Sequence, residues 1–206
     1  MKILTLWTIL SYLIGSLPTG YLVVRLLHRD AQGRRDKLDI RTVGSGAIGA
    51  TNVRRVMGRG WAVAVTAIDM SKGALALLLS AHSAASSPLL SAVAAFAAVM
   101  GHNYPIWLKF RGGKGVATTY GTMFFIWPYR SFAIVLLCGA IWYAIMTSTR
   151  YVSLASMISL LALPAFFWML DAPLPFMLLA AVLAALAIFR HRSNIARLLR
   201  GEENAV

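Results

Sequence analysis

The chain has 206 residues, of which 59% are hydrophobic and only 13% are charged, and its formal net charge is +13. Ordinary globular proteins have roughly 25% charged residues, and a signal peptide accounts for one apolar segment only, so the composition excludes a soluble domain and indicates an integral membrane protein. Because the basic residues lie mainly between apolar runs, they favour loops on one side of a membrane over a nucleic-acid-binding face.

Apolar runs follow one another along the whole chain and predict an all-α, polytopic membrane helix bundle that forms one domain over residues 1–206. We expect about seven transmembrane helices, of which the fourth is short. The predicted runs are Leu4–Leu27, Trp61–Leu79, Pro88–Met100, Val116–Trp127, Phe132–Met146, Val152–Leu170 and Phe176–Phe189.

The charges predict how these helices are oriented. The segment 28–60, between the first two runs, contains eight Lys or Arg and three Asp, which is typical of a cytoplasmic loop. This places the N-terminus outside and the C-terminus inside, with an outer turn at 84–87. Of twenty basic residues only Lys2 and Arg130 then fall clearly outside, and Lys72 lies within a run.

The first run is interrupted at Gly15–Gly20, which includes Pro18. A proline lacks an N–H group and usually kinks a helix. Breaks in membrane helices also occur where backbone faces a cavity. Both readings, a kink and a cavity-facing break, stay open.

The polar segment Val43–Arg55 contains the pattern G-x-G-x-x-G, followed 20 residues later by Asp69. A dinucleotide site needs a βαβ unit, whereas Asp69 lies in an apolar run, so we reject that reading. Short polar donors and Arg55 favour binding of an oxyanion. The alternative is a glycine-rich loop with arginines that only set the topology.

The segment Gly101–Gly121 lies between apolar runs, yet it contains one His, two Lys, one Arg and a cluster of glycines. Glycines leave backbone N–H groups uncovered, so Gly112–Gly115 with Lys114 predict a cradle for phosphate. A nucleotide P-loop is excluded, because Gly115 stands where Ser or Thr must follow the lysine. The alternative is an ordinary membrane-flanking loop.

Ionisable residues inside the apolar runs are few. Asp69 and Lys72 are three residues apart and would share one helix face. They either serve function or neutralise each other. His102 is more often a hydrogen-bonded packing residue than a proton carrier in such a place.

Two further features lie toward the C-terminus. Ser153 is positioned to cap a helix near the membrane surface. The tail His191–Glu203 has Ile195, Leu198 and Leu199 at helical spacing, which predicts an amphipathic interfacial helix.

Metal and disulfide chemistry have no support in the sequence. The single Cys138 lies in an apolar run and cannot form an internal disulfide. No His/carboxylate cluster has ligand spacing, so we expect neither a metal nor another cofactor.

Taken together, these clusters resemble the bacterial acyl-phosphate–glycerol-3-phosphate acyltransferases, the PlsY family. The resemblance covers nearly the whole chain in the family's order. The matching residues are Ser16, Pro18, Gly20, Gly44–Gly46, Gly49–Asn52, Arg55, Asp69, Lys72, Gly73, Gly101, His102, Pro105, Phe110, Gly112–Thr118, Gly121, His191, Arg192, Asn194, Ile195, Arg197–Leu199, Gly201 and Glu203.

The resemblance implies a seven-helix, multi-pass enzyme of the bacterial cytoplasmic (inner) membrane, with its active site facing the cytoplasm. It implies transfer of an acyl group from acyl phosphate to the 1-hydroxyl of glycerol 3-phosphate, giving lysophosphatidic acid and inorganic phosphate. This is the first step of phospholipid biosynthesis. Direct attack without an acyl-enzyme is expected, the expected partners are these substrates and membrane lipid, and we expect a monomer.

The resemblance also assigns candidate site residues. Those expected to act in catalysis are Lys114, Arg55, Ser45, His191 and Asn194. Either His191 or a substrate phosphate oxygen would take the proton. Those expected to bind substrate are Gly44, Gly46, Gly49, Thr51, Asn52, Lys72, His102, Gly112, Gly113, Gly115, Thr118 and Ser153.

The chain departs from the family pattern in two places. Ala47 stands where Asn is common, and the stretch His28–Lys37 is long and charged for the first loop. The alternative function is a small transporter of an anionic metabolite, since broken helices and phosphate-friendly loops suit that class as well.

Overall fold

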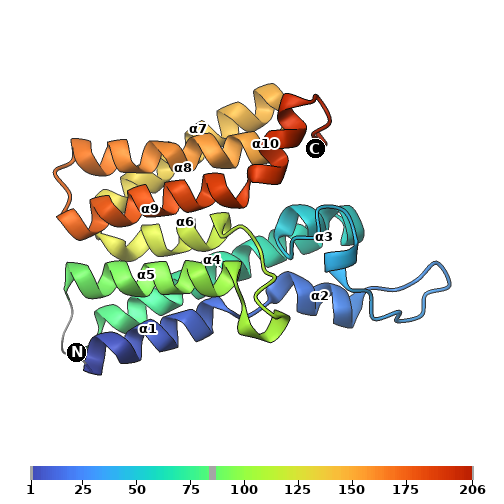
Figure 1. Ribbon diagram of the computed structural model, residues 1–206, viewed down its shortest axis with the longest axis horizontal. Coiled ribbons are helices and arrows are strands. Elements are labelled where there is room, and N and C mark those ends of the chain that lie inside the picture. The colour runs from blue at the N-terminus through green and yellow to red at the C-terminus, as the bar shows by residue number, and fades with distance from the viewer. Residues whose placement is uncertain (1, 84–86, 206) are drawn as a thin grey trace.

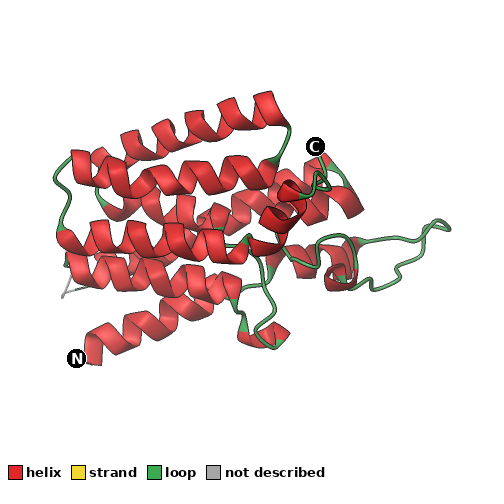
Figure 2. Ribbon diagram, turned by 45° about the horizontal axis from the view of Figure 1, so that its top comes forward, coloured by secondary structure: helices red, strands yellow, loops and turns green. Residues whose placement is uncertain are grey.

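The computed structural model describes residues 2–83 and 87–205, and in this part of the chain the regular secondary structure is entirely helical (Figure 2). Part of the predicted outer turn 84–87 lies outside the described residues. The elements are α1 Lys2–Gly15, α2 Thr19–Leu27, η1 Ile40–Thr42, α3 Ala50–Met57, α4 Arg59–Ala81, α5 Pro88–Asn103, η2 Ile106–Leu108, α6 Val116–Ile126, α7 Arg130–Thr149, α8 Val152–Met169, α9 Leu174–Arg190 and α10 Arg192–Leu199.

The long helices lie roughly side by side and form a bundle (Figure 1). The short helices α3 and α10, the C-terminus and the loops after α2 and α5 gather at one end, on the right of that view. We call this the polar end. The charged stretch His28–Lys37 extends beyond it as a narrow loop whose two sides pair through an isolated bridge between Arg29 and Arg35.

The number of independent spans is smaller than the seven predicted. Among the described residues, five helices are long and apolar enough to cross a membrane, or six if the bent pair α9–α10 is one span. The fourth predicted run is α6, whose 11 residues reach about 17 Å, well short of about 30 Å of hydrocarbon. The structure leaves the predicted orientation of the termini untested.

The first span is broken, since α1 ends at Gly15 and α2 begins at Thr19. At the break, the carbonyl of Leu17 accepts a hydrogen bond from the N–H of Thr19 at 3.0 Å instead of one from the next helical turn. The Lys72 ammonium donates a hydrogen bond to this oxygen at 2.9 Å. The freed backbone therefore contacts a buried cation rather than an open cavity.

Glycines bring two helix pairs close together. A Cβ atom at Gly101 would meet the carbonyl of Tyr12, and one at Gly121 would meet the carbonyl of Met70. Small residues at such contacts let helix backbones approach, which is how membrane helices pack when lipid is as apolar as their side chains. These contacts fix α5 against α1 and α6 against α4.

Apolar packing is divided between two clusters. The larger one lies within the bundle and includes Leu77, Met123, Leu160 and Phe167. The smaller one holds the short elements of the polar end together and contains Val24, Ile40, Ile48, Val53, Val65 and Leu108. The smaller cluster therefore anchors the loop 40–49 at the polar end.

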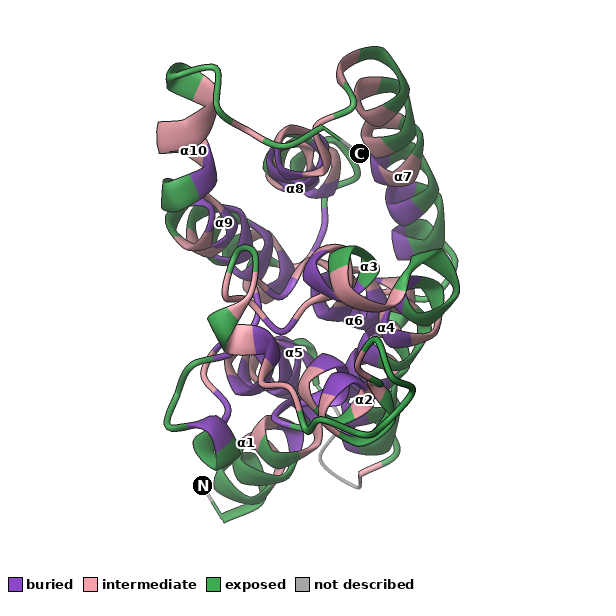
Figure 3. Ribbon diagram, turned by 90° about the vertical axis from the view of Figure 1, so that its right-hand side faces the viewer, coloured by how far each residue is buried: buried purple, intermediate pink, exposed green. Residues whose placement is uncertain are grey.

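Helix α7 contributes Ile134, Val135 and Cys138 to the larger cluster, but most of its surface lies outside the packing. Only 17% of its apolar window is buried, the lowest share among the five candidate spans. In Figure 3, which looks onto the polar end, the outward face of α7 is exposed along its length. We infer that lipid covers this face and that α7 forms a thin wall of the bundle.

Candidate functional site

A cavity of about 710 Å³ opens at the polar end and extends between the helices. Its polar part, which we call the mouth, is lined by Ser45, Thr51, Arg55, Lys114, Ser153, His191, Asn194 and Glu203. Its apolar part is lined by Val116, Ala117, Tyr120 and Phe124 of α6, Val135, Leu136, Gly139 and Ala140 of α7 and further residues of these walls. The volume lies in the range of small-molecule sites.

The apolar part follows α6 from Val116 to Phe124, which corresponds to a depth of about 12 Å. Helix α7 runs in the opposite direction, so Val135 lies deep and Tyr143 lies nearer the mouth. A cavity with a cationic mouth and an apolar interior suits a molecule that carries a phosphate at the end of an aliphatic chain.

Four helices begin at this cavity. The first residues of α3, α6 and α8 line it, and α10 begins directly after His191. The first N–H groups of a helix have no partner within the helix, and the N-terminus carries a partial positive charge. No side chain caps any of these four N-termini. Their N–H groups and dipoles thus favour an anion at the mouth.

The ammonium group of Lys114 is fixed at the mouth by a hydrogen bond. Its ammonium donates a hydrogen bond to Asn194 Oδ1 at 2.5 Å. Asn194 Nδ2 in turn donates to Glu203 Oε1 at 2.6 Å. This chain of contacts orients Lys114 and leaves two of its three N–H groups for a ligand in the cavity.

Glu203 closes this network from the C-terminal tail. Its Oε1 also accepts a hydrogen bond from the Ser153 hydroxyl at 2.7 Å, and its Oε2 pairs with Arg197 Nε at 2.7 Å. Donors from α8 and α10 thereby hold one carboxylate, whose pKa is lowered despite its burial because Asn194, Ser153 and Arg197 donate hydrogen bonds to it. Sequence reasoning quoted Glu203 without giving it a role.

Electrostatics at the mouth are dominated by cations. Burial lowers the pKa of Lys114 to about 8, and the nearby guanidinium groups of Arg197, Arg55 and Arg190 act in the same direction. The charge of Glu203 opposes this shift. The mouth without ligand thus carries an excess of positive charge that a phosphate would compensate.

Arg55 differs from Lys114 because no hydrogen bond within the described residues fixes its side chain. It is exposed, it lines the cavity, and it has no hydrogen bond or ion pair to any other described residue. Its neighbour Arg54 is also exposed but does not line the cavity. Arg55 is therefore a free guanidinium fork at the mouth.

His191 presents one ring nitrogen to the site. Its Nδ1 lies 2.8 Å from the carbonyl of Ala187, and a carbonyl oxygen only accepts hydrogen bonds, so Nδ1 carries the proton. In the neutral ring Nε2 is then an acceptor. Because His191 is buried and lines the cavity, Nε2 is placed to take a proton there.

Several predicted site residues have a structural role instead. Asn52 lines the cavity, but its Nδ2 donates to the carbonyls of Ile40, Val43 and Ala47, and its Oδ1 accepts from Ser45 N–H. Its two N–H groups are thus fully used, shared among three carbonyls, to hold the loop 40–47. This loop places Ser45 at the mouth.

The prediction that Gly112–Gly115 form a cradle for phosphate was wrong for two of these glycines. The N–H groups of Gly112 and Gly113 donate to the carbonyls of Asn103 and His102, so they are not open to phosphate. The carbonyl of Gly113 instead accepts from Arg190 at 2.6 Å. These glycines allow close packing, since a Cβ atom at Gly113 would meet the His102 ring.

Lys72 does not reach the cavity either. Its ammonium pairs with Asp69 at 2.7 Å and donates to His102 Nδ1 at 2.9 Å, in addition to Leu17. Both side chains of the ion pair are at most 4% exposed. Asp69 and Lys72 therefore neutralise each other, and His102 is the hydrogen-bonded packing residue that its position favoured, although it also lines the cavity.

The remaining predicted residues divide as follows. Gly49, Thr51 and Gly115 line the cavity, whereas Gly44 and Thr118 do not. Gly46 lines a second cavity. Ser153 is not a helix cap, because Tyr151 takes that position and Ser153 binds Glu203. The amphipathic tail is shorter than predicted, because α10 ends at Leu199 and the chain then turns back to bring Glu203 to the site.

Comparisons with known proteins agree on one family. A family model for glycerol-3-phosphate acyltransferases matches residues 5–201. The glycerol-3-phosphate acyltransferase of Gloeobacter violaceus is 42% identical over 198 residues, which cover 94% of this chain and 90% of that protein. That of Caulobacter vibrioides is 43% identical over 195 residues, with coverage of 94% and 83%.

Two crystal structures are similar over almost the whole fold. Both are of PlsY, an integral membrane glycerol 3-phosphate acyltransferase. The glycerol 3-phosphate form has a TM-score of 0.87 and 36% identity, covering 98% of this chain and 95% of that one. The lysophosphatidic acid form has a TM-score of 0.83 and 35% identity, with coverage of 98% and 94%.

Proposed function

The chain belongs to the glycerol-3-phosphate acyltransferase family, and from this premise we propose how its cavity carries out the reaction. The enzyme acylates glycerol 3-phosphate to lysophosphatidic acid, a step of phospholipid biosynthesis. Our proposal concerns the acyl donor, the roles of the residues at the mouth and the side of the membrane on which the mouth lies.

The cavity itself is the observation that supports this proposal best. Its cationic mouth and its apolar part, about 12 Å deep, match a fatty acyl phosphate, whose chain would lie along α6 and α7. The phosphate of this donor would stay at the mouth beside the glycerol 3-phosphate. An acyl phosphate is a mixed anhydride and already activated, so phosphate can leave without a metal or another cofactor.

The two phosphates need positive charge and N–H donors. Lys114, Arg55 and the N-terminus of α3 supply these at the mouth, and Ser45 adds a hydroxyl. We assign Lys114 to the developing oxyanion and the leaving phosphate, because the contact with Asn194 holds its ammonium in place before substrate binds. Arg55, which is free, would close onto a phosphate when it binds.

The attack is direct. Among the described residues, no serine that lines the cavity donates a hydrogen bond to His191: Ser153 binds Glu203, and Ser156 binds the carbonyl of Val152. Within the same part of the chain, the third serine of the lining, Ser45, makes no hydrogen bond to His191 either, so none of the three is activated as a nucleophile. His191 Nε2 would accept the proton of the 1-hydroxyl of glycerol 3-phosphate as this oxygen attacks the acyl carbon. Holding both substrates at one mouth supplies much of the rate.

Charge distribution supports a cytoplasmic mouth. Basic residues are concentrated in the loops and short helices of the polar end, and cytoplasmic loops of membrane proteins carry an excess of Lys and Arg. Glycerol 3-phosphate is a cytoplasmic metabolite, so a mouth on this side meets its substrate. We place the protein in the bacterial cytoplasmic membrane, as a monomer.

The test uses purified protein in detergent with palmitoyl phosphate or palmitoyl-CoA as donor. We expect phosphate release from palmitoyl phosphate only when glycerol 3-phosphate is present, with one lysophosphatidic acid per phosphate, and no turnover of palmitoyl-CoA. Turnover of palmitoyl-CoA would contradict the donor. Phosphate release without glycerol 3-phosphate, together with a trapped acyl-protein, would contradict direct attack.

A further inference from the structure

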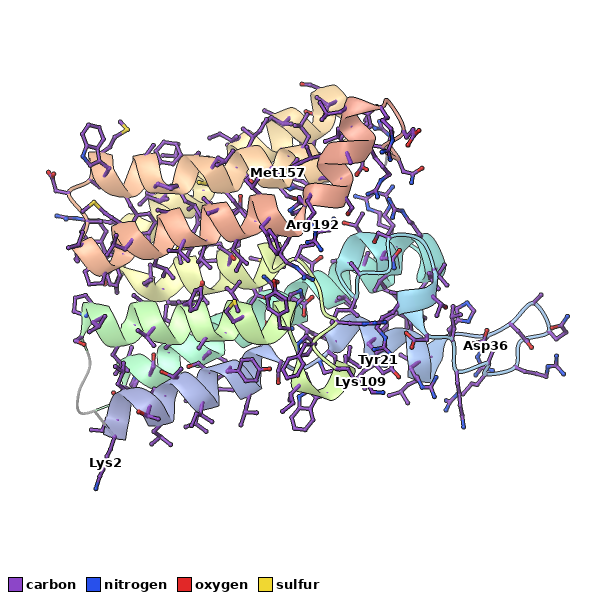
Figure 4. All side chains as sticks on the ribbon, in the orientation of Figure 1. Lys2, Tyr21, Asp36, Lys109, Met157 and Arg192 are labelled. Atoms are coloured by element: carbon purple, nitrogen blue, oxygen red, sulfur yellow. The ribbon has the colours of Figure 1, made fainter. Side chains whose placement is uncertain are left out.

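A second cavity, of about 590 Å³, lies at the polar end on the side of α2 and η2. Its lining includes Tyr21, Arg41, Gly46, Lys109 and Arg111. Figure 4 labels Tyr21 and Lys109 close to each other at this end of the bundle. Nothing in the acyl transfer reaction uses these residues.

Arg41 forms the frame of this second cavity. Its guanidinium makes a bidentate ion pair with Asp39, with Nη2 at 2.6 Å from Oδ2, and its Nη1 donates to the carbonyl of Leu108 at 3.2 Å. The same group lies over the ring of Tyr21, 5.2 Å from its centroid. Arg41 thereby ties η1 to η2 and α2, and its charge is compensated by Asp39.

Lys109 and Arg111 are the uncompensated charges. Both are exposed, and neither has a hydrogen bond or ion pair from its side chain to any residue in the described ranges 2–83 and 87–205. Lys109 has a left-handed backbone with φ of 53°, and the next residue, Phe110, has φ of 61°. Two consecutive non-glycine residues in this region are strained, and such strain gathers at functional sites.

A phosphate group fits a cavity that presents the two unpaired cations Lys109 and Arg111 between walls held together by Arg41. Its surroundings favour the phosphate of a lipid over a free one. The third candidate span ends at Leu108, so Lys109 and Arg111 follow the membrane-spanning segment directly. Trp107 and Phe110 are 63% and 57% exposed, and aromatic residues at the ends of spans lie at the level of lipid head groups.

Trp107 is held in this position. Its indole Nε1 donates to the Ser16 hydroxyl at 2.8 Å, at the break between α1 and α2. An acyl chain could lie against the exposed faces of Trp107 and Phe110 while the head group enters between Lys109 and Arg111. We propose that the second cavity binds the phosphate of an anionic membrane phospholipid.

This site is separate from the active site, although the two share a wall. Ser45 and Ala47 line the first cavity, whereas Gly46 between them lines the second. The segment that begins with Lys109 continues through Arg111 to Lys114 at the mouth. A lipid in the second cavity therefore contacts both loops that shape the mouth, without occupying it.

Native mass spectrometry of the purified full chain, titrated with dioleoylphosphatidylglycerol, tests the proposal. We expect one tightly bound lipid in the wild type and its loss in the double variant Lys109→Gln/Arg111→Gln. Affinity should fall about 30-fold, since each Lys or Arg near an anionic lipid contributes about a factor of five. The matched control is Arg34→Gln/Arg35→Gln in the protruding loop, which should keep the lipid.

Further measurements distinguish a lipid phosphate from free phosphate and charge from side-chain shape. The variant Lys109→Arg retains the charge and should retain the lipid. Dioleoylphosphatidylcholine, which is zwitterionic, should bind at least about tenfold more weakly than the anionic lipid. Displacement of the lipid by millimolar inorganic phosphate would assign the cavity to free phosphate and overturn the lipid assignment. Equal lipid affinity in wild type and double variant, with unchanged turnover and melting temperature, would overturn the site altogether.

Discussion

Two lysines, Lys72 and Lys114, each belong to a hydrogen-bonded cluster that includes a carboxylate, yet their surroundings differ: Lys72 is buried, whereas Lys114 is partly exposed. Lys72 has its three contacts inside the helix bundle: Asp69, His102 and the carbonyl of Leu17. Lys114 contacts Asn194 and faces the cavity with the rest of its ammonium group. A lysine whose donors are all used within the protein stabilises it, whereas one with donors left over can bind a ligand.

Replacing Lys72 should have the largest effect on stability. Lys72→Met leaves Asp69 as an unpaired buried charge, so we expect unfolding to become easier by about 3–5 kcal/mol, which lowers the melting temperature by about 10 °C or more. The double variant Asp69→Asn/Lys72→Met removes both charges and should recover most of this loss. Unchanged melting with lost turnover would return Lys72 to the substrate site, as the sequence predicted.

Replacing Lys114 should show the opposite pattern. Lys114→Ala removes the ammonium that faces the reacting groups, so kcat/KM should fall about 10³-fold, the range found when one oxyanion donor is lost. The melting temperature should change little, because Lys114 holds only Asn194. The measurement is steady-state kinetics and melting temperature of both lysine variants under the same conditions. If both variants lost stability and turnover to the same extent, the distinction between the two lysines would be wrong.

Arg55 tests whether a cation without a partner inside the protein contributes to substrate binding. Arg55→Ala removes a cation with no partner inside the protein, so its loss should raise KM for glycerol 3-phosphate by about 10- to 100-fold, the value of a hydrogen bond to a charged group. Arg54→Ala, on the same helix but away from the cavity, is the matched control and should stay within about twofold of wild type. An equal effect of both variants would indicate a general loss of surface charge.

The smallest effect concerns pH. The pKa of Lys114 is lowered to about 8, so its charge is present below this pH and lost above it. Because we assign this charge to the oxyanion and the leaving phosphate, kcat/KM should fall as the pH passes through about 8. In Lys114→Arg this fall should be absent up to about pH 10, because a guanidinium stays charged. A kcat/KM that does not change between pH 7 and 10 in the wild type would contradict the role of this charge.

The helices were predictable because the backbone N–H and C=O groups of each long apolar run need hydrogen-bond partners inside lipid, and a helix supplies these partners within the run. Trp61–Leu79 corresponds to α4, and Pro88–Met100 corresponds to α5, within a few residues. The sequence also predicted Lys114 and Arg55 as site residues, and both line the cavity. Which N–H groups and cations remain free depends on contacts across the fold, such as Gly113 N–H with the His102 carbonyl, and no local pattern encodes these.

Glu203 illustrates the same limit from the other side. Two neighbouring glutamates, Glu202 and Glu203, have no local signature that tells which one enters the site, and the partner Ser153 lies 50 residues earlier than Glu203. The uncapped helix N-termini could have been found, since no Ser, Thr, Asp or Asn stands at the N-cap of α3 or α6. The glycines at these positions predicted the phosphate site, whereas the helices that begin after them also supply free N–H groups.

The break after Gly15 has a consequence for how the protein is made. While the chain is being synthesised, the carbonyl of Leu17 has only the N–H of Thr19 as a partner, because Lys72 has not yet been made. Lys72 in turn needs His102 of α5. The break in the first span therefore gains its buried cation only after α4 and α5 have been made, so this part of the fold reaches its final set of contacts late in synthesis.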